Sequence, residues 1–178
     1  DVSGAEIYAA VLAQSPASAV CDRDFRMLRK EFPGRLSLIA FHATHLARTQ
    51  RLTSACLVLS TALKQRKMPA DRWPLIRAAI TLPLQAGVPG LAEDQLNRYR
   101  GEVPEEDLVT FYEGQLLHLQ GQHDEALQKM SEVLRMRAKL DRRHDPLVAD
   151  TVRWIQKIRR SQDRSASSDT STSPSPLR

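Results

Sequence analysis

The sequence predicts an all-α protein. Of its 178 residues, 42% are hydrophobic but only 5% are aromatic, and Ala, Leu, Arg and Gln are abundant. Unbranched side chains lose little rotamer freedom in a helix, so this composition favours helices over sheets. The seven glycines are few for an all-β chain of this length, which would need many tight turns. A recurring helical spacing of small and apolar residues is the third observation that predicts helices.

The recurring spacing is clearest towards the C-terminal half of the chain, where small and apolar residues stand at Gly114, Leu117, Gly121, Ala126, Met130, Val133 and Leu134. Matching positions lie 71 residues earlier, at Ala43, Leu46, Gln50, Ala55, Leu59, Ala62 and Leu63. A degraded copy lies between these two, at Ala79, Leu82, Gly87, Ala92, Leu96 and Tyr99. A first copy is found at Ala9, Leu12, Cys21, Phe25 and Leu28. The period is therefore about 35 residues.

Each copy predicts one helix-turn-helix unit, near residues 2–34, 36–69, 71–103 and 106–139. A small residue early in the first helix of each unit would let the second helix approach closely: Ala9, Ala43, Ala79 and Gly114. Its expected counterparts at the helix crossing are Cys21, Ala55, Ala92 and Ala126. Large apolar residues three and four positions away would fill the groove that remains.

A 35-residue period with these features resembles the tetratricopeptide repeat, over about residues 2–139. The resemblance implies a right-handed α-solenoid in which the first helices of successive units line a concave groove. The third unit departs from the family pattern. Pro74 is compatible with a first helical turn, whereas Pro83 is expected to kink or shorten its helix. Trp73 is the nearest equivalent of the family's aromatic residue in the first helix.

A capping helix is predicted over residues 145–161, with Asp145 as its N-cap before Pro146. Its apolar stripe consists of Leu147, Val148, Val152, Ile155 and Ile158. A helix of this kind would cover the last repeat of a solenoid and present a polar face to water. The Ser-rich residues 162–178 have little apolar surface to bury, so we expect a disordered tail.

The resemblance also implies a site for a partner. The groove positions of the family fall on Ala40, Thr44, Arg48, Trp73, Ile76, Ile80, Leu108, Phe111, Gln115 and His118. Their later half is apolar and aromatic, which favours binding of a peptide or an amphipathic helix of another protein. The alternative is that some of these residues are core, or contact the capping helix.

No catalytic, cofactor or metal site is predicted. His42 and His45 stand three apart on a predicted helix, but two ligands do not make a metal site, and we expect a packed His42 and a surface His45. His118 and His123 flank the turn at Gly121, and Asp124 is expected to begin a helix. The serines gather in the tail, where nothing would hold a base against them, and no Gly-rich phosphate loop precedes a helix. We therefore expect a protein that is not an enzyme.

Charge leaves other functions open. The net charge is +5, and residues 126–164 contain eleven Lys or Arg against five acids. Such a region could bind phosphate, as in helical-repeat RNA-binding proteins, but no polar pair recurs from unit to unit as a base code requires. A solvated helix face explains the same charges.

The apolar stretches are too short to span a membrane. The start at Asp1 is consistent with a piece of a larger enzyme or secretion machine, and it leaves the compartment open.

Overall fold

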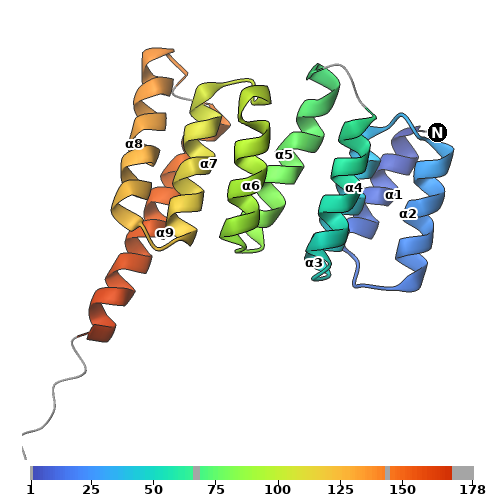
Figure 1. The fold of residues 1–178 in the computed structure, drawn as a ribbon, viewed down its shortest axis with the longest axis horizontal. Coiled ribbons are helices and arrows are strands. Elements are labelled where there is room, and N and C mark those ends of the chain that lie inside the picture. Colours follow the sequence, from blue (N-terminus) through green and yellow to red (C-terminus); the bar gives the residue numbers. More distant parts are fainter. Residues whose placement is uncertain (1, 66–68, 143–144, 170–178) are drawn as a thin grey trace, which may run out of the picture. The chain divides into compact units, whose positions relative to one another are not determined.

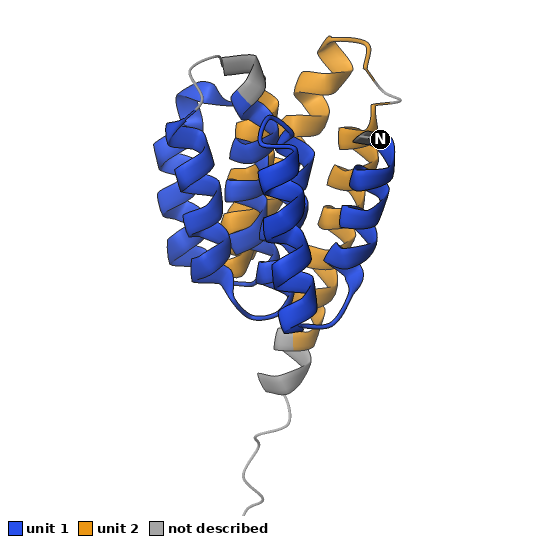
Figure 2. Cartoon of the chain, turned by 90° about the vertical axis from the view of Figure 1, so that its right-hand side faces the viewer, with its two compact units in different colours: residues 1–104 blue, residues 105–178 orange. Residues whose placement is uncertain are grey.

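The computed structural model describes residues 2–65, 69–142 and 145–169. Over these residues the chain forms nine α-helices, one short 3₁₀ helix and no strand, which confirms the predicted all-α class. The chain divides into two compact units, residues 1–104 and 105–178, coloured separately in Figure 2. Within the described residues, no helix combines the length and the apolarity that a membrane span needs.

The first unit contains six α-helices in three consecutive pairs (Figure 1). They are α1 (Val2–Gln14), α2 (Ala19–Glu31), α3 (Leu36–Arg48), α4 (Leu52–Lys64), α5 (Pro69–Gln85) and α6 (Pro89–Tyr99), followed by the 3₁₀ helix η1 (Arg100–Glu102). Each helix packs against its partner in the pair, and α3 also contacts α1 and α5. The small residues expected at the crossings are all buried: Ala9, Cys21, Ala43, Ala55, Ala79 and Ala92.

The turns between helices follow the repeated positions found in the sequence. Gln50, Gly87 and Gly121 all have positive φ, at 61°, 69° and 81°. This left-handed conformation ends a helix and reverses the chain, and glycine adopts it without the Cβ clash that other residues meet. Gln50 therefore adopts, at a cost in conformational energy, the left-handed conformation that glycine provides at Gly87 and Gly121.

The two prolines of α5 lie inside the helix. The sequence predicts Pro74 in the first turn of its helix. The helix begins at Pro69, so Pro74 lies beyond the first turn. The helix continues past Pro83 to Gln85, so Pro83 does not itself end it, and a kink at Pro83 stays a prediction. A proline removes one backbone hydrogen bond, and the tertiary packing of α5 compensates for that loss here: α5 contacts α3, α4 and α6.

The second unit contains α7 (Glu106–Leu119), α8 (His123–Lys139) and α9 (Pro146–Asp169). Helix α8 packs against both α7 and α9. Gly114 of α7 lies at the closest approach to α8, because a Cβ added there would come within 3.4 Å of the backbone oxygen of Ala126. Ala126 itself is fully buried. The predicted close contact between these two positions is therefore confirmed.

Helix α9 begins as predicted but differs in its stripe and its length. Asp145 Oδ1 accepts a hydrogen bond of 2.8 Å from the backbone N–H of Leu147, which confirms the cap. Thr151 is fully buried and Val152 is 40% exposed, so Val152 does not belong to the buried stripe. The helix continues past residue 161 to Asp169, since no Pro or Gly interrupts it. The rest of the expected tail, residues 170–178, lies outside the described residues.

Candidate protein-interaction surfaces

Helix α1 is apolar on two opposite faces. Its inner face buries Ala9, Leu12 and Ala13. Its outer face exposes Ile7 at 67% and Val11 at 59%, one helical turn apart. A helix that is apolar all round is normally buried on all sides, so the outer face of α1 has the character of a contact surface.

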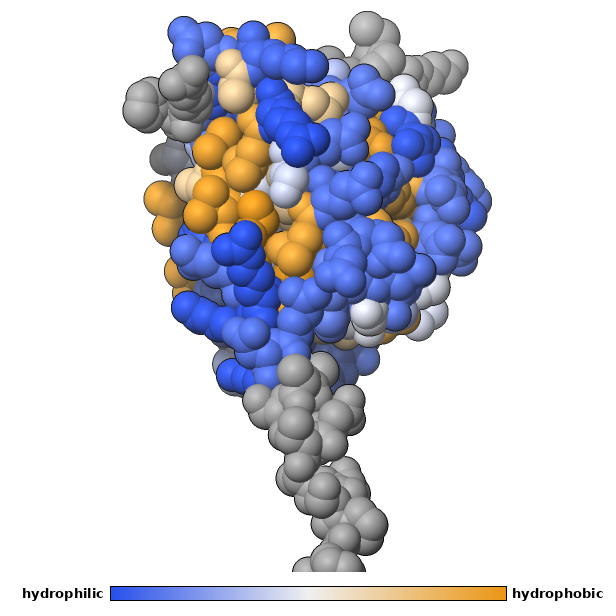
Figure 3. Space-filling view, turned by 90° about the vertical axis from the view of Figure 1, so that its left-hand side faces the viewer, coloured by the Kyte–Doolittle hydropathy of each residue, from blue (hydrophilic) through white to orange (hydrophobic). Residues whose placement is uncertain are grey.

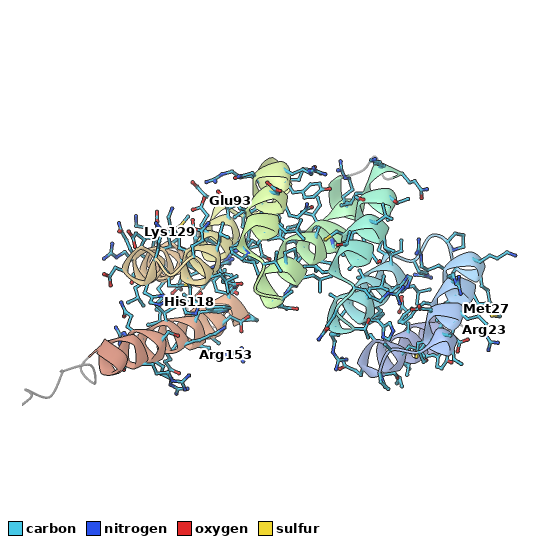
Figure 4. The ribbon with its side chains drawn as sticks, turned by 60° about the horizontal axis from the view of Figure 1, so that its bottom comes forward. Arg23, Met27, Glu93, His118, Lys129 and Arg153 are labelled. Carbon is cyan, nitrogen blue, oxygen red and sulfur yellow. The ribbon has the colours of Figure 1, made fainter. Side chains whose placement is uncertain are left out.

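Helix α2 extends this surface. Val20 and Met27 are 57% and 59% exposed, two turns apart on one side of the helix. Tyr8 of α1, 45% exposed, donates a hydrogen bond of 2.6 Å from Oη to Oδ2 of Asp24 in α2, and this bond raises the pKa of Tyr8. Figure 4 shows Met27 on the outer side of α2, together with Arg23.

We call this surface the α1–α2 apolar face and define it by its five exposed side chains: Ile7, Tyr8, Val11, Val20 and Met27. Their combined exposed area is on the order of 500 Å², which is the size of the largest apolar patch on a typical monomer, and such patches often bind a partner. The sequence analysis did not identify this face, because the repeat pattern selects only Ala9 and Leu12 from this helix.

In the first unit, the predicted groove residues divide into buried and accessible ones. Ile76 and Ile80 are fully buried, so they offer no surface to a partner. Thr44 and Trp73 are half-buried. Arg48 is exposed, but its Nη1 donates to the backbone oxygen of Ala13 at 2.7 Å and so links α3 to the end of α1.

The predicted groove residues of the second unit divide in the same way. Phe111 and Gln115 are 6% and 7% exposed, which leaves a partner little to contact. Leu108 and His118 are half-buried. A role of these groove residues in binding stays a prediction. The accessible ones are Ala40, Thr44, Arg48 and Trp73 in the first unit and Leu108 and His118 in the second.

His118 belongs to a cluster formed by all three helices of the second unit. Its Nδ1 lies 3.2 Å from Nδ1 of His123, and its ring meets Trp154 edge-on with 5.7 Å between the centroids. Nζ of Lys157 lies 4.1 Å from the centroid of the Trp154 ring. Figure 4 shows His118 between α7 and α9. Burial, followed by the charges of His123 and Lys157, lowers the pKa of His118, so its ring is neutral at pH 7.

The other predicted histidine pair is core. His42 stacks on Phe25 with 4.9 Å between the ring centroids, as expected for a packed residue. His45 is fully buried, which overturns its expected place on the surface. The error arose because α3 packs against α1, α2, α4 and α5, so more than one side of it is covered. Among the described residues, no group of three or more His, Cys, Asp or Glu could hold a metal ion.

An ion-pair network orders one end of the second unit. Arg137, only 3% exposed, contacts both carboxylate oxygens of Asp107 through Nε at 2.6 Å and Nη2 at 3.0 Å. It also pairs with Glu105 and, at 3.1 Å, with Asp145. A hydrogen bond from Arg142 lowers the pKa of Glu105. Arg137 therefore stabilises the fold and is not part of the solvated basic face that the sequence predicted.

Helix α9 carries a row of basic residues at helical spacing. Arg153, Lys157, Arg160 and Arg164 are exposed and border a shallow depression. Arg153 pairs with Asp150 in the preceding turn. Figure 3 views the molecule from the side of the second unit, where hydrophilic residues border a patch of apolar ones. The positive charges of this row, one helical turn apart, could bind phosphate groups or the acidic side chains of a partner.

Comparisons of the chain with models of protein families, with curated proteins and with solved structures gave no match. The resemblance to the tetratricopeptide repeat therefore rests on the residues quoted from the sequence, and the arrangement of the helices as a solenoid stays a prediction.

Proposed function

We propose that this chain is a non-enzymatic scaffold that binds an amphipathic helix of another protein. The α1–α2 apolar face carries this proposal, because it exposes five large apolar side chains on two adjacent helices. A third helix can lie against such a pair with its apolar side chains between the two ridges.

The charges around the face indicate the polar side of the partner. Arg23 has 66% of its side chain exposed and makes one long ion pair of 3.5 Å with Asp24. Lys30 is exposed further along α2. We therefore expect an amphipathic partner helix with acidic residues beside its apolar stripe, since charge complementarity steers association and fixes orientation.

The accessible groove residues form the second part of the proposal. Trp73 is the largest of them, and large aromatic side chains commonly dominate the energy of an interface. A partner that engages the groove would depend on Trp73, whereas a partner on the α1–α2 apolar face would depend on Ile7 and Val11. The two sites are therefore distinguishable by substitution.

The test uses the full chain as bait, identification of the protein it retains, and titration calorimetry with that protein after purification. Ile7→Glu or Val11→Glu should weaken binding about tenfold to a hundredfold, because a charge would be buried against an apolar stripe. Val88→Glu is the matched control, since Val88 is 40% exposed and lies outside the face. Trp73→Ala tests the groove.

The outcomes separate the candidate functions. If Ile7→Glu, Val11→Glu and Trp73→Ala all bind the purified partner like the unsubstituted chain, both sites are refuted.

RNA binding is the alternative that the basic row on α9 favours. It predicts binding that weakens steeply with salt and depends on residues such as Arg160. The alternative of a module in a larger enzyme or assembly predicts that the retained protein is a stable subunit.

A further inference from the structure

A pocket of about 410 Å³ lies in the first unit, against the C-terminal part of α2. Arg26, Arg29 and Lys30 line one side of it, at helical spacings of three and four residues. The apolar side chains of Ile39 in α3 and Ala62 in α4 contribute to the lining as well. The volume is within the range of small-molecule sites, about 300–1,000 Å³.

The three cations of this pocket lack acidic partners. No carboxylate lines the pocket, and none of the three takes part in an ion pair among the described residues. Arg26 donates from Nε to the backbone oxygen of Asp22, a neutral acceptor. The nearby carboxylate of Asp22 is already bound to Arg51 at 2.6 Å. Like charges one helical turn apart repel each other, so an anion here would relieve an unfavourable arrangement.

Arg29 is held in place without being neutralised. Its Nη1 lies 3.3 Å from Nδ1 of His42. Burial, then the charge of Arg29, lowers the pKa of His42 to about 4, so the ring is neutral at pH 7 and Nδ1 can accept this hydrogen bond. A neutral acceptor orients the guanidinium and leaves its full charge and its other N–H groups for a ligand.

We propose that this pocket binds a small organic anion, with its carboxylate or phosphate group against Arg26, Arg29 and Lys30 and an apolar group against the half-buried ring of Phe32, which also lines the pocket. Charge-assisted hydrogen bonds from arginine are the strong contacts in such a site, and the apolar lining would select ligands that also carry a hydrocarbon group. None of the five side chains that define the α1–α2 apolar face lines the pocket. Lys30 is common to both proposals, so Arg29→Gln, Ile7→Glu and Val11→Glu are the substitutions that separate them.

The experiment is a titration of the ¹⁵N-labelled full chain with phenyl phosphate at fixed ionic strength, followed by amide chemical shifts. We expect saturable shifts confined to residues 26–39 and 61–65, with Kd on the order of 1 mM for a ligand of this size. Inorganic phosphate, which lacks the ring, should bind at least about tenfold more weakly, and phenol, which lacks the charge, should not saturate. A capped peptide with adjacent Glu and Leu tests whether the same anion can come from a protein.

Two kinds of variant test the assignment. Arg29→Gln and Lys30→Gln should each weaken phenyl phosphate binding about tenfold, whereas Arg23→Gln, an exposed arginine of the same helix, should not. Thr61→Glu would place a carboxylate at the exposed rim of the pocket. It should abolish binding and raise the melting temperature, because the cations then gain an internal partner.

Shifts that spread outside the pocket, or equal affinity of Arg29→Gln and Arg23→Gln, would overturn the proposal. So would a Thr61→Glu variant that keeps its affinity and shows no gain in melting temperature. Because Thr61→Glu is expected to stabilise the chain, a failure of the other variants to fold does not remove the test.

Discussion

Substitution of Gly114 by alanine tests the close contact between α7 and α8. A Cβ at this position would lie 2.8 Å from Cε of Met130 and 3.3 Å from Cβ of Lys129. Alanine in a helix interior is favoured over glycine by about 1 kcal/mol. Against this gain, Met130 is fully buried and must move its terminal methyl within a packed core, which costs about 1–3 kcal/mol. We expect Gly114→Ala to lower the free energy of unfolding by up to about 2 kcal/mol, the difference between this cost and this gain.

Urea denaturation of four variants, namely the three single substitutions at Gly114, Gly90 and Met130 and one double substitution, measures the two contributions separately. Gly90→Ala is the control for helix propensity, because Gly90 lies in α6 and nothing is within 4 Å of an added Cβ. It should be neutral or stabilising. Met130→Leu removes the terminal methyl that the new Cβ would meet, so its combination with Gly114→Ala should show a favourable coupling of about 1 kcal/mol. If Gly114→Ala stabilises the chain as much as Gly90→Ala does, the close-contact argument is wrong.

Three further outcomes are expected from urea denaturation. Burial lowers the pKa of His42 to about 4, below its unfolded value of 6.5, so the unfolded chain binds more protons between these two values. Stability should therefore fall by about 2 kcal/mol, after allowance for solvent screening, as pH drops from 6.5 to 4, and His42→Gln should lack this part of the pH dependence. Arg137→Met should cost about 3–5 kcal/mol because it leaves Asp107 buried without a partner, and Asp107→Leu in the same chain should recover most of the loss. Ile158→Ala should cost about 2–5 kcal/mol, whereas Val152→Ala on the exposed side of the same helix should change stability by less than about 0.5 kcal/mol.

The helices and their turns were predictable because local rules determine them. Small residues at a fixed spacing identified the helix crossings, and the structure buries Ala43 and Ala126 where they were expected. The position shared by Gln50, Gly87 and Gly121 proved to be a left-handed turn in each case. Glycine at two of these three positions indicates a left-handed turn even in a single sequence, since few other residues adopt that conformation readily.

The partners of buried polar groups were not predictable. Arg137 looked like one of many solvated basic residues, but Asp107 and Asp145, on either side of it in the sequence, pair with it in the fold. His45 was expected on the surface, but its helix has neighbours on more than one side and buries it. Both errors have one cause: helical periodicity indicates which residues share a face, but not how many neighbouring helices cover that face.

The same limit explains why the site predicted from the sequence and the site favoured by the structure differ. Groove positions such as Ile76 and Phe111 follow from the resemblance to the repeat family, and apolar residues on a helix with several neighbours become core. Ile7 and Val11 look equally like core in the sequence, but among the described helices α1 makes its main contacts with α2 and α3, and its outer side is exposed. An apolar residue therefore indicates a binding surface only once the number of helices around it is known. Because Ile7 and Val11 make few internal contacts, polar replacements there should leave the free energy of unfolding almost unchanged, and a loss of binding can then be assigned to the surface itself.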